Sequence, residues 1–181
     1  MNRVATALAA LLLLTACSSG SSSTTPEADK PEASGTTSTS PTAAAAVMPP
    51  IKATAVVAGL SDAGYKCSND GSYGICTSGA ASVWVLTGSH PRPPVVSLHS
   101  AGPADVASAE IAKVLPKTLE IAHINQGQQI VDWFGQQEGK TTAQLTVGDW
   151  LVEYSVEVDT EEPGAHLTLT DKLCTANCQA E

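Results

Sequence analysis

The sequence has few basic residues and few aromatic ones. Lysine and arginine number 9 against 18 aspartates and glutamates in 181 residues, which gives a formal net charge of -9 at pH 7. Nucleic acids need Lys and Arg to neutralise their phosphates, and anionic lipid surfaces attract basic segments. This charge balance therefore excludes nucleic acid as a partner and electrostatic attachment as the means of membrane binding.

Motifs of catalytic and metal-binding machinery are also missing. Four histidines lie far apart in the sequence: His90, His99, His123 and His166. None belongs to a His-x-x-x-His or His-Glu-x-x-His motif, and no serine lies in a Gly-x-Ser-x-Gly motif. The acidic loop at Asp159, Glu161 and Glu162 lacks the regular spacing of a dedicated calcium loop. We assign no catalytic residue, no metal ligand and no cofactor.

Long apolar runs are missing except at the N-terminus. Arg3 precedes an apolar run from Val4 to Leu14. As a helix, this run rises only about 16 Å, roughly half the hydrocarbon thickness of a bilayer. A basic start, a short apolar core and small residues before a cleavage point describe a secretory signal peptide, which we place at residues 1–16.

The signal segment ends in Leu14-Thr15-Ala16-Cys17, which resembles the lipobox of bacterial lipoproteins. The resemblance implies cleavage before Cys17 and a diacylglycerol thioether on its sulfur. It also implies a protein anchored by this lipid to the extracytoplasmic face of the cell membrane. The alternative is an ordinary signal peptide or membrane anchor in which the cysteine is incidental.

Residues 17–50 lack the large apolar side chains that a core requires. They consist mainly of Ser, Thr, Ala, Pro and Gly. Burial cannot offset the entropy of ordering such a backbone, so we expect a disordered tether after the lipidated cysteine. Residues 51–181 have the size of one domain and can bury a core.

Cysteine is scarce, and its number is even once Cys17 is set aside. In an exported chain, four cysteines indicate two disulfides with three possible pairings. Cys67 and Cys76 flank a turn-rich segment that a hairpin would close. We favour Cys67–Cys76 with Cys174–Cys178. Two alternatives stay open, a bond between the C-terminus and the first hairpin and a four-cysteine zinc site, for which the Cys67–Cys76 spacing is wide.

The first half of the domain has the pattern of one helix and three strands. Apolar residues recur at helical spacing from Ala53, and Gly64 follows as a C-cap. β-Branched and aromatic residues then predict strands at Tyr73–Thr77, Ser82–Thr87 and Pro94–His99. Trp84 lies mid-strand between two valines, so we expect it in the core.

Two further helices are predicted before the last strands. Pro103 suits the first turn of a helix that Pro116 should kink or divide. Asn125 and Gln128 have the spacing of a capping box at the start of the next helix. That helix carries Trp133 and Phe134, which cannot both point into the core because successive helical residues lie about 100° apart.

Strict alternation of apolar residues defines the last strands. It runs through Ala143–Val147 and Trp150–Val158 and continues at Leu167 and Leu169, which places these side chains on one face. The opposite face is polar and carries Glu153, Glu157 and His166, and His99 could meet His166 there across two strands. Such a face is typical of an antiparallel sheet with one side in solvent.

We therefore predict an α+β domain in which an antiparallel sheet of five to six strands carries about three helices on one face. A helix followed by three strands occurs twice, at a period of about 70 residues. This order resembles the pseudo-symmetric repeat layout of the β-lactamase inhibitor proteins of soil bacteria, which are also secreted and carry local disulfides. The resemblance covers element order and one short-loop disulfide, and the second predicted hairpin has no cysteine.

These features predict a membrane-anchored module of the cell envelope that binds another envelope protein or a cell-wall component. Two alternatives stay open: a small envelope hydrolase that uses the sheet-face histidines, and a carrier that holds a lipid or other small ligand between sheet and helices. A flat polar sheet would favour the binding module. Converging His and Glu beside a strained backbone would favour the hydrolase, and a deep cavity would favour the carrier.

Overall fold

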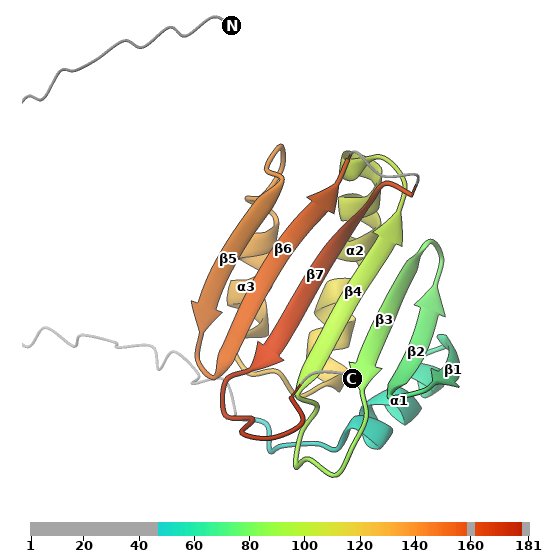
Figure 1. The fold of residues 1–181 in the computed structure, drawn as a ribbon, viewed down its shortest axis with the longest axis vertical. Helices are drawn as coiled ribbons and strands as arrows, with labels where there is room; N and C mark the ends of the chain where they lie inside the picture. The colour runs from blue at the N-terminus through green and yellow to red at the C-terminus, as the bar shows by residue number, and fades with distance from the viewer. Residues whose placement is uncertain (1–46, 159–161, 179–181) are drawn as a thin grey trace, which may run out of the picture. The chain divides into compact units, whose positions relative to one another are not determined.

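The computed structural model describes residues 47–158 and 162–178. The predicted signal peptide, Cys17 and most of the predicted tether lie outside these ranges, as do Asp159 and Glu161. Within the described residues, three helices and seven strands build one layer of helices and one sheet (Figure 1). No helix among them is both long enough and apolar enough to cross a bilayer.

The elements follow one another along the chain with short connections. In order they are α1 (Ala53–Asp62), β1 (Lys66–Asp70), β2 (Tyr73–Ser78), β3 (Ala81–Leu86), β4 (Val95–Ala101), α2 (Ala104–Ile121), α3 (Gly127–Phe134), β5 (Thr142–Val147), β6 (Trp150–Glu157) and β7 (Gly164–Asp171).

All seven strands belong to a single antiparallel sheet with the order β1-β2-β3-β4-β7-β6-β5. Figure 1 shows α2 and α3 behind the sheet, and none of the helices that the structure describes covers the other face. The α+β class is as predicted, but the sheet has more strands than the five to six expected. The unpredicted strand is β1, whose residues are mostly polar, and pairing with β2 in the disulfide hairpin holds it in place.

The core lies between the sheet and the helices. Alternate residues of the inner strands point toward the helices and are completely buried, for example Val83, Leu98 and Leu167. Helix α2 packs against them with Ile111 and Leu115, which are also completely buried. The hydrophobic effect across this single interface supplies the main stabilisation of the fold.

The sequence predicts that Pro116 kinks or divides α2, and the division is wrong because α2 continues through Pro116. Proline removes the hydrogen bond to the carbonyl of the residue four positions earlier, here Ala112. Both Pro116 and Ala112 are exposed, so water can hydrogen-bond to that carbonyl. Leu115 and Leu119 on the opposite side stay buried and hold the helix against the sheet.

Asn125 does not cap α3, and the predicted capping box is wrong. The N-cap residue is Gln126, in a left-handed conformation (φ 63°), and no side chain caps the helix. The Asn125 side chain instead bonds the backbone of Met48: Oδ1 accepts from its N–H at 2.9 Å, and Nδ2 donates to its carbonyl at 3.3 Å. Met48, which belongs to the predicted tether, is therefore hydrogen-bonded to the domain.

The structure contains the two disulfides that the sequence favours, Cys67–Cys76 and Cys174–Cys178. Cys67 and Cys76 are direct partners in the β1–β2 ladder, with Cα atoms 4.0 Å apart. Cys174–Cys178 closes a short loop after β7, with Cα atoms 5.8 Å apart. The first disulfide therefore fixes a register, and the second shapes a loop.

Three strands of the first half have counterparts in the second half. Strands β2, β3 and β4 begin at residues 73, 81 and 95, and β5, β6 and β7 begin at residues 142, 150 and 164, which is 69 residues later in each case. The two sets meet at the central β4–β7 pair, with β2 and β5 at matching outer positions. Strand β1 and helix α2 have no counterpart in this correspondence.

Candidate functional site

The helix-free face of the sheet is a broad surface that all seven strands build together. Seven strands about 4.8 Å apart make it roughly 29 Å wide. One complete row of direct partners crosses it: Ser68, Ile75, Trp84, Ser97, Thr168, Glu153 and Gln144. A second complete row is Lys66, Thr77, Ser82, His99, His166, Ser155 and Thr142.

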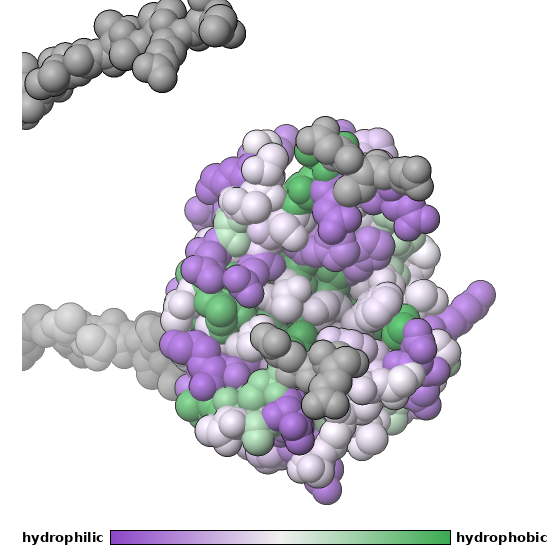
Figure 2. All heavy atoms as spheres, in the orientation of Figure 1, coloured by the Kyte–Doolittle hydropathy of each residue, from purple (hydrophilic) through white to green (hydrophobic). Residues whose placement is uncertain are grey.

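At the centre of this face the side chains are short and carry hydroxyl groups, so they project little from the strands. Ser97 Oγ donates to Thr168 Oγ1 at 3.3 Å across the β4–β7 pair. Figure 2 views this side of the molecule and shows hydrophobic and intermediate residues among hydrophilic ones. These short side chains lie on paired strands and have little conformational freedom. A partner that binds this part of the face would therefore cause only a small loss of side-chain entropy.

Trp84 lies on this outer face, and its predicted core position is wrong. Val83 and Val85 are completely buried, so alternation along β3 turns Trp84 away from the helices, and 37% of it is exposed. Its ring meets Tyr73 edge-on, with centroids 5.8 Å apart, and its Nε1 donates to Ser82 Oγ at 3.0 Å. The face therefore presents an oriented aromatic pair near β2 and β3.

Phe134 and Trp150, unlike Trp84, are buried in the core. Trp150 is 3% exposed, as predicted. Phe134 is 6% exposed and Trp133 is only half-buried, so these two neighbours do not both point into the core, as the helical spacing predicts. Phe134 contacts Tyr154 edge-on, with ring centroids 5.5 Å apart.

His99 and His166 meet on the outer face as direct partners of β4 and β7. Their ring centroids are 4.4 Å apart, and His166 Nε2 lies 3.7 Å from Glu157 Oε1. Burial lowers the pKa of His99, and the charge of His166 lowers it further, while Glu157 and Glu162 act in the opposite direction. Glu153 is exposed on the same face, where its Oε1 accepts from Gln144 Nε2 at 3.2 Å.

The lowered pKa of His99 predicts a loss of stability in acid. As the pH falls through the ordinary histidine value of 6.5, the unfolded chain takes up this proton first, because the folded chain has the lower pKa. The free energy of unfolding should therefore decrease from neutral pH to about pH 5, and His99→Gln should make that decrease smaller. Urea melts at several pH values give the slope of the free energy of unfolding against pH for the parent and for His99→Gln. Equal slopes in parent and variant would contradict the prediction.

The histidine pair lacks the other parts of a hydrolytic site. Among the side-chain hydrogen bonds of the described residues, none joins a histidine ring to a serine or cysteine side chain. His90 Nε2 lies 2.7 Å from the carbonyl of Ala176, and His123 Nδ1 lies 2.8 Å from that of Pro49. Within residues 47–158 and 162–178, no group of three His, Cys, Asp or Glu side chains is placed to hold a metal ion.

A second surface feature lies on the helix side, where α2 begins and α3 ends. It is an open groove of about 710 Å³ between these helices, strand β6 and the loop that leads to β5. Tyr154 and Phe134 form its floor, and the hydroxyls of Tyr154 and Ser108 are hydrogen-bonded at 2.8 Å. Sequence analysis did not locate this groove because its lining comes from three separate segments: residues 104–112, 134–141 and 154–158.

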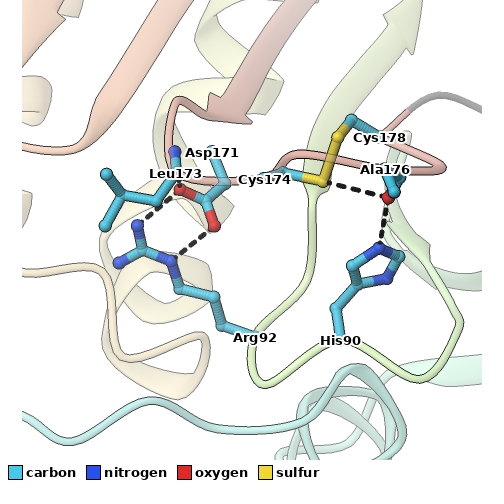
Figure 3. Close-up of a disulfide and its surroundings, with 7 residues drawn as sticks. All are labelled: His90, Arg92, Asp171, Leu173, Cys174, Ala176 and Cys178. Atoms are coloured by element: carbon cyan, nitrogen blue, oxygen red, sulfur yellow. Dashed lines mark hydrogen bonds and ion pairs between the residues drawn. A yellow bond between two sulfur atoms is a disulfide. The ribbon is translucent and has the colours of Figure 1, made fainter.

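The loops at the other end of the sheet are joined by Arg92. Its guanidinium donates to both carboxylate oxygens of Asp171, with Nε–Oδ2 at 2.7 Å and Nη2–Oδ1 at 2.5 Å (Figure 3). The guanidinium also lies 5.0 Å from the ring centroid of Trp150. Asp171 Oδ1 also accepts the backbone N–H of Leu173 at 2.8 Å. Because 79 positions separate Arg92 from Asp171, no local pattern indicates this pair.

His90 extends this cluster to the C-terminal disulfide loop (Figure 3). Its Nε2 contact with the Ala176 carbonyl joins the β3–β4 loop to the segment closed by Cys174–Cys178. Together with Arg92 and Asp171, this contact holds the last described residues against the sheet end. We assign the cluster a structural role.

Comparison with known proteins adds no relative to this picture. No family model, no curated protein and no solved structure matches the chain. The domain is therefore not assigned to a family, and a functional argument must come from its own surfaces.

Proposed function

We propose that this chain is a lipid-anchored binding module on the extracytoplasmic face of a cell membrane, and that its helix-free sheet face docks another envelope protein. The observation that carries the docking surface is the second complete row, which is polar on all seven strands, next to the exposed Trp84 of the first row. The lipobox resemblance at Cys17 and the signal peptide support the location.

The chemistry of the face suits a protein partner. Trp and Tyr are enriched at binding hot spots because they bury a large apolar area and keep a polar atom for hydrogen bonding. Trp84 and Tyr73 are held in one relative orientation by their edge contact. Less ordering would then be needed on binding, which favours affinity.

The charge of the face favours a basic partner. Glu153 and Glu157 are exposed on β6, and Asp70 is exposed on β1, whereas Lys66 is the exposed cation of the two complete rows. A complementary basic patch would raise the association rate and specify orientation. The equal spacing of β2–β4 and β5–β7 supports a second element of the proposal, that the sheet consists of two structural repeats.

Site-specific photo-crosslinking tests the docking surface in cells that carry the full chain. A photoreactive phenylalanine at Ser97, in the centre of the face, should form a discrete protein adduct. The same residue at Ala58, an exposed position of α1, should not form it. Trp84→Ala should reduce the Ser97 adduct several-fold, while Trp133→Ala on the helix side should leave it unchanged.

The outcomes separate the alternatives. Equal adducts from Ser97 and Ala58, or none from Ser97, would refute docking on the sheet face. An adduct that a wall-degrading muramidase converts to small fragments would replace the protein partner with a cell-wall component.

The anchor is tested separately by detergent partitioning. The parent chain should enter the detergent phase because its acyl chains bind membranes stably, whereas Cys17→Ala should be released or remain unprocessed. Equal partitioning of the processed parent and variant would refute lipidation at Cys17 and leave the docking surface untouched.

A further inference from the structure

We propose that the groove between α2, α3 and β6 binds an amphiphile with one hydrocarbon chain and an uncharged, hydroxylated head, as in a monoacylglycerol. The groove lies on the helix side of the sheet, so this site is separate from the docking surface proposed above. Its volume of about 710 Å³ lies within the range of sites that bind small molecules.

Small residues on α2 create the space. Ala104, Ser108 and Ala112 recur every four residues and so share one side of the helix, and Ala109 lies next to them. Larger side chains at these positions would fill the gap between α2 and the sheet. Opposite them stands Val156 on β6, and Val158 after it is 58% exposed, which is unusual for a large aliphatic side chain.

The floor combines apolar surface with one polar pair. Phe134 and Tyr154 provide aromatic carbon, and both are nearly buried. In the hydrogen bond between Tyr154 and Ser108, only one of the two hydroxyl hydrogens is used, so the other can be donated to a ligand. A hydrocarbon chain fits the walls, and a hydroxyl or ester oxygen fits this donor.

The charged residues around the groove favour an uncharged head group on the ligand. Asp105, Glu138 and Lys140 all belong to the lining, and Lys140 Nζ already donates to Gln137 Oε1 at 3.0 Å. Two carboxylates against one engaged ammonium give no excess of positive charge for a phosphate or carboxylate. Hydroxyl groups can donate to the carboxylates and accept from the ammonium, which makes an uncharged, hydroxylated head the complementary one.

Calorimetric titration of the chain from Ser18 to Glu181 tests this site with 1-monolauroylglycerol and laurate, both below their micellar concentrations, and with glycerol. Monolauroylglycerol should bind saturably with one molecule per chain. Laurate should bind at least tenfold more weakly because its head is anionic, and glycerol should not bind because it has no chain.

Two matched variants locate the binding. Ala109→Phe fills the groove and should weaken monolauroylglycerol binding at least tenfold, whereas Ala58→Phe changes an equally exposed helical alanine on α1 and should leave it unchanged. Ala112→Leu fills the same groove and replaces Ala109→Phe in this test if Ala109→Phe does not unfold cooperatively. Absence of saturable binding by the parent, or an equal loss in Ala58→Phe, would overturn the site. Laurate binding as tight as that of monolauroylglycerol would overturn the uncharged head.

Discussion

Replacing Trp150 by alanine should lower the free energy of unfolding by about 3 to 5 kcal/mol. Trp150 is 3% exposed, so the change leaves a cavity between the sheet and the helices and removes a large buried apolar surface. It also deletes the ring that lies 5.0 Å from the Arg92 guanidinium, a contact of about 1 kcal/mol in partly desolvated sites. Urea denaturation followed by far-ultraviolet circular dichroism measures the change.

Trp84→Ala is the matched control for this prediction. The same side chain is removed from β3, but on the outer face, where 37% of the residue already meets solvent. Losing its edge contact with Tyr73 and its hydrogen bond to Ser82 should cost about 1 kcal/mol. Equal losses for Trp84→Ala and Trp150→Ala would mean that both lie in the core and that the register of β3 is wrong by one residue.

Replacing Arg92 by alanine should lower the free energy of unfolding by about 3 kcal/mol, the lower end for breaking a buried ion pair. The Arg92 side chain is 16% exposed, and the Asp171 side chain is only 7% exposed. The variant therefore leaves a nearly buried carboxylate with the Leu173 N–H as its remaining donor. Arg92→Lys should lose an intermediate amount, because lysine restores the charge without the two parallel hydrogen bonds.

An exposed ion pair provides the comparison for Arg92. Lys113 and Glu110 lie three residues apart on α2, and the Lys113 side chain is 67% exposed. Lys113→Ala should change the free energy of unfolding by less than about 0.5 kcal/mol, because solvent screens such pairs. Urea melts of both variants give the two values. A loss as small for Arg92→Ala as for Lys113→Ala would show that the loops at this end are held without the Arg92–Asp171 pair.

Alternation and local spacing were sufficient to predict much of the fold. Strand β6 alternates from Trp150 to Val156 because one sheet face packs on helices and the other meets water, and this contrast is present in the residues themselves. The Cys67–Cys76 disulfide was accessible for a similar reason, since a hairpin is a local structure whose turn residues lie between the two cysteines. The meeting of His99 and His166 could be anticipated from their shared face.

Local reasoning failed where a distant contact outweighs a local preference. The run from Val83 to Leu86 is continuously apolar, so its period is ambiguous, and only the helix layer over Val83 and Val85 decides that Trp84 points outward. Pro116 opposes a helix locally, but the burial of Leu115 and Leu119 keeps α2 continuous. Strand β1 has weak strand propensity and exists because β2 pairs with it.

The sequence by itself determined the α+β class, the inward face of the last strands, the disulfide hairpin and the features that predict export and a lipid anchor. These are encoded in periodicity and spacing, which reflect burial and turn geometry over a few residues. The tertiary structure alone decided the strand order with β4 beside β7, the Arg92–Asp171 pair and the groove under α2. Each of these joins segments that are far apart in the chain, and their contacts depend on how whole elements pack, which no local pattern specifies.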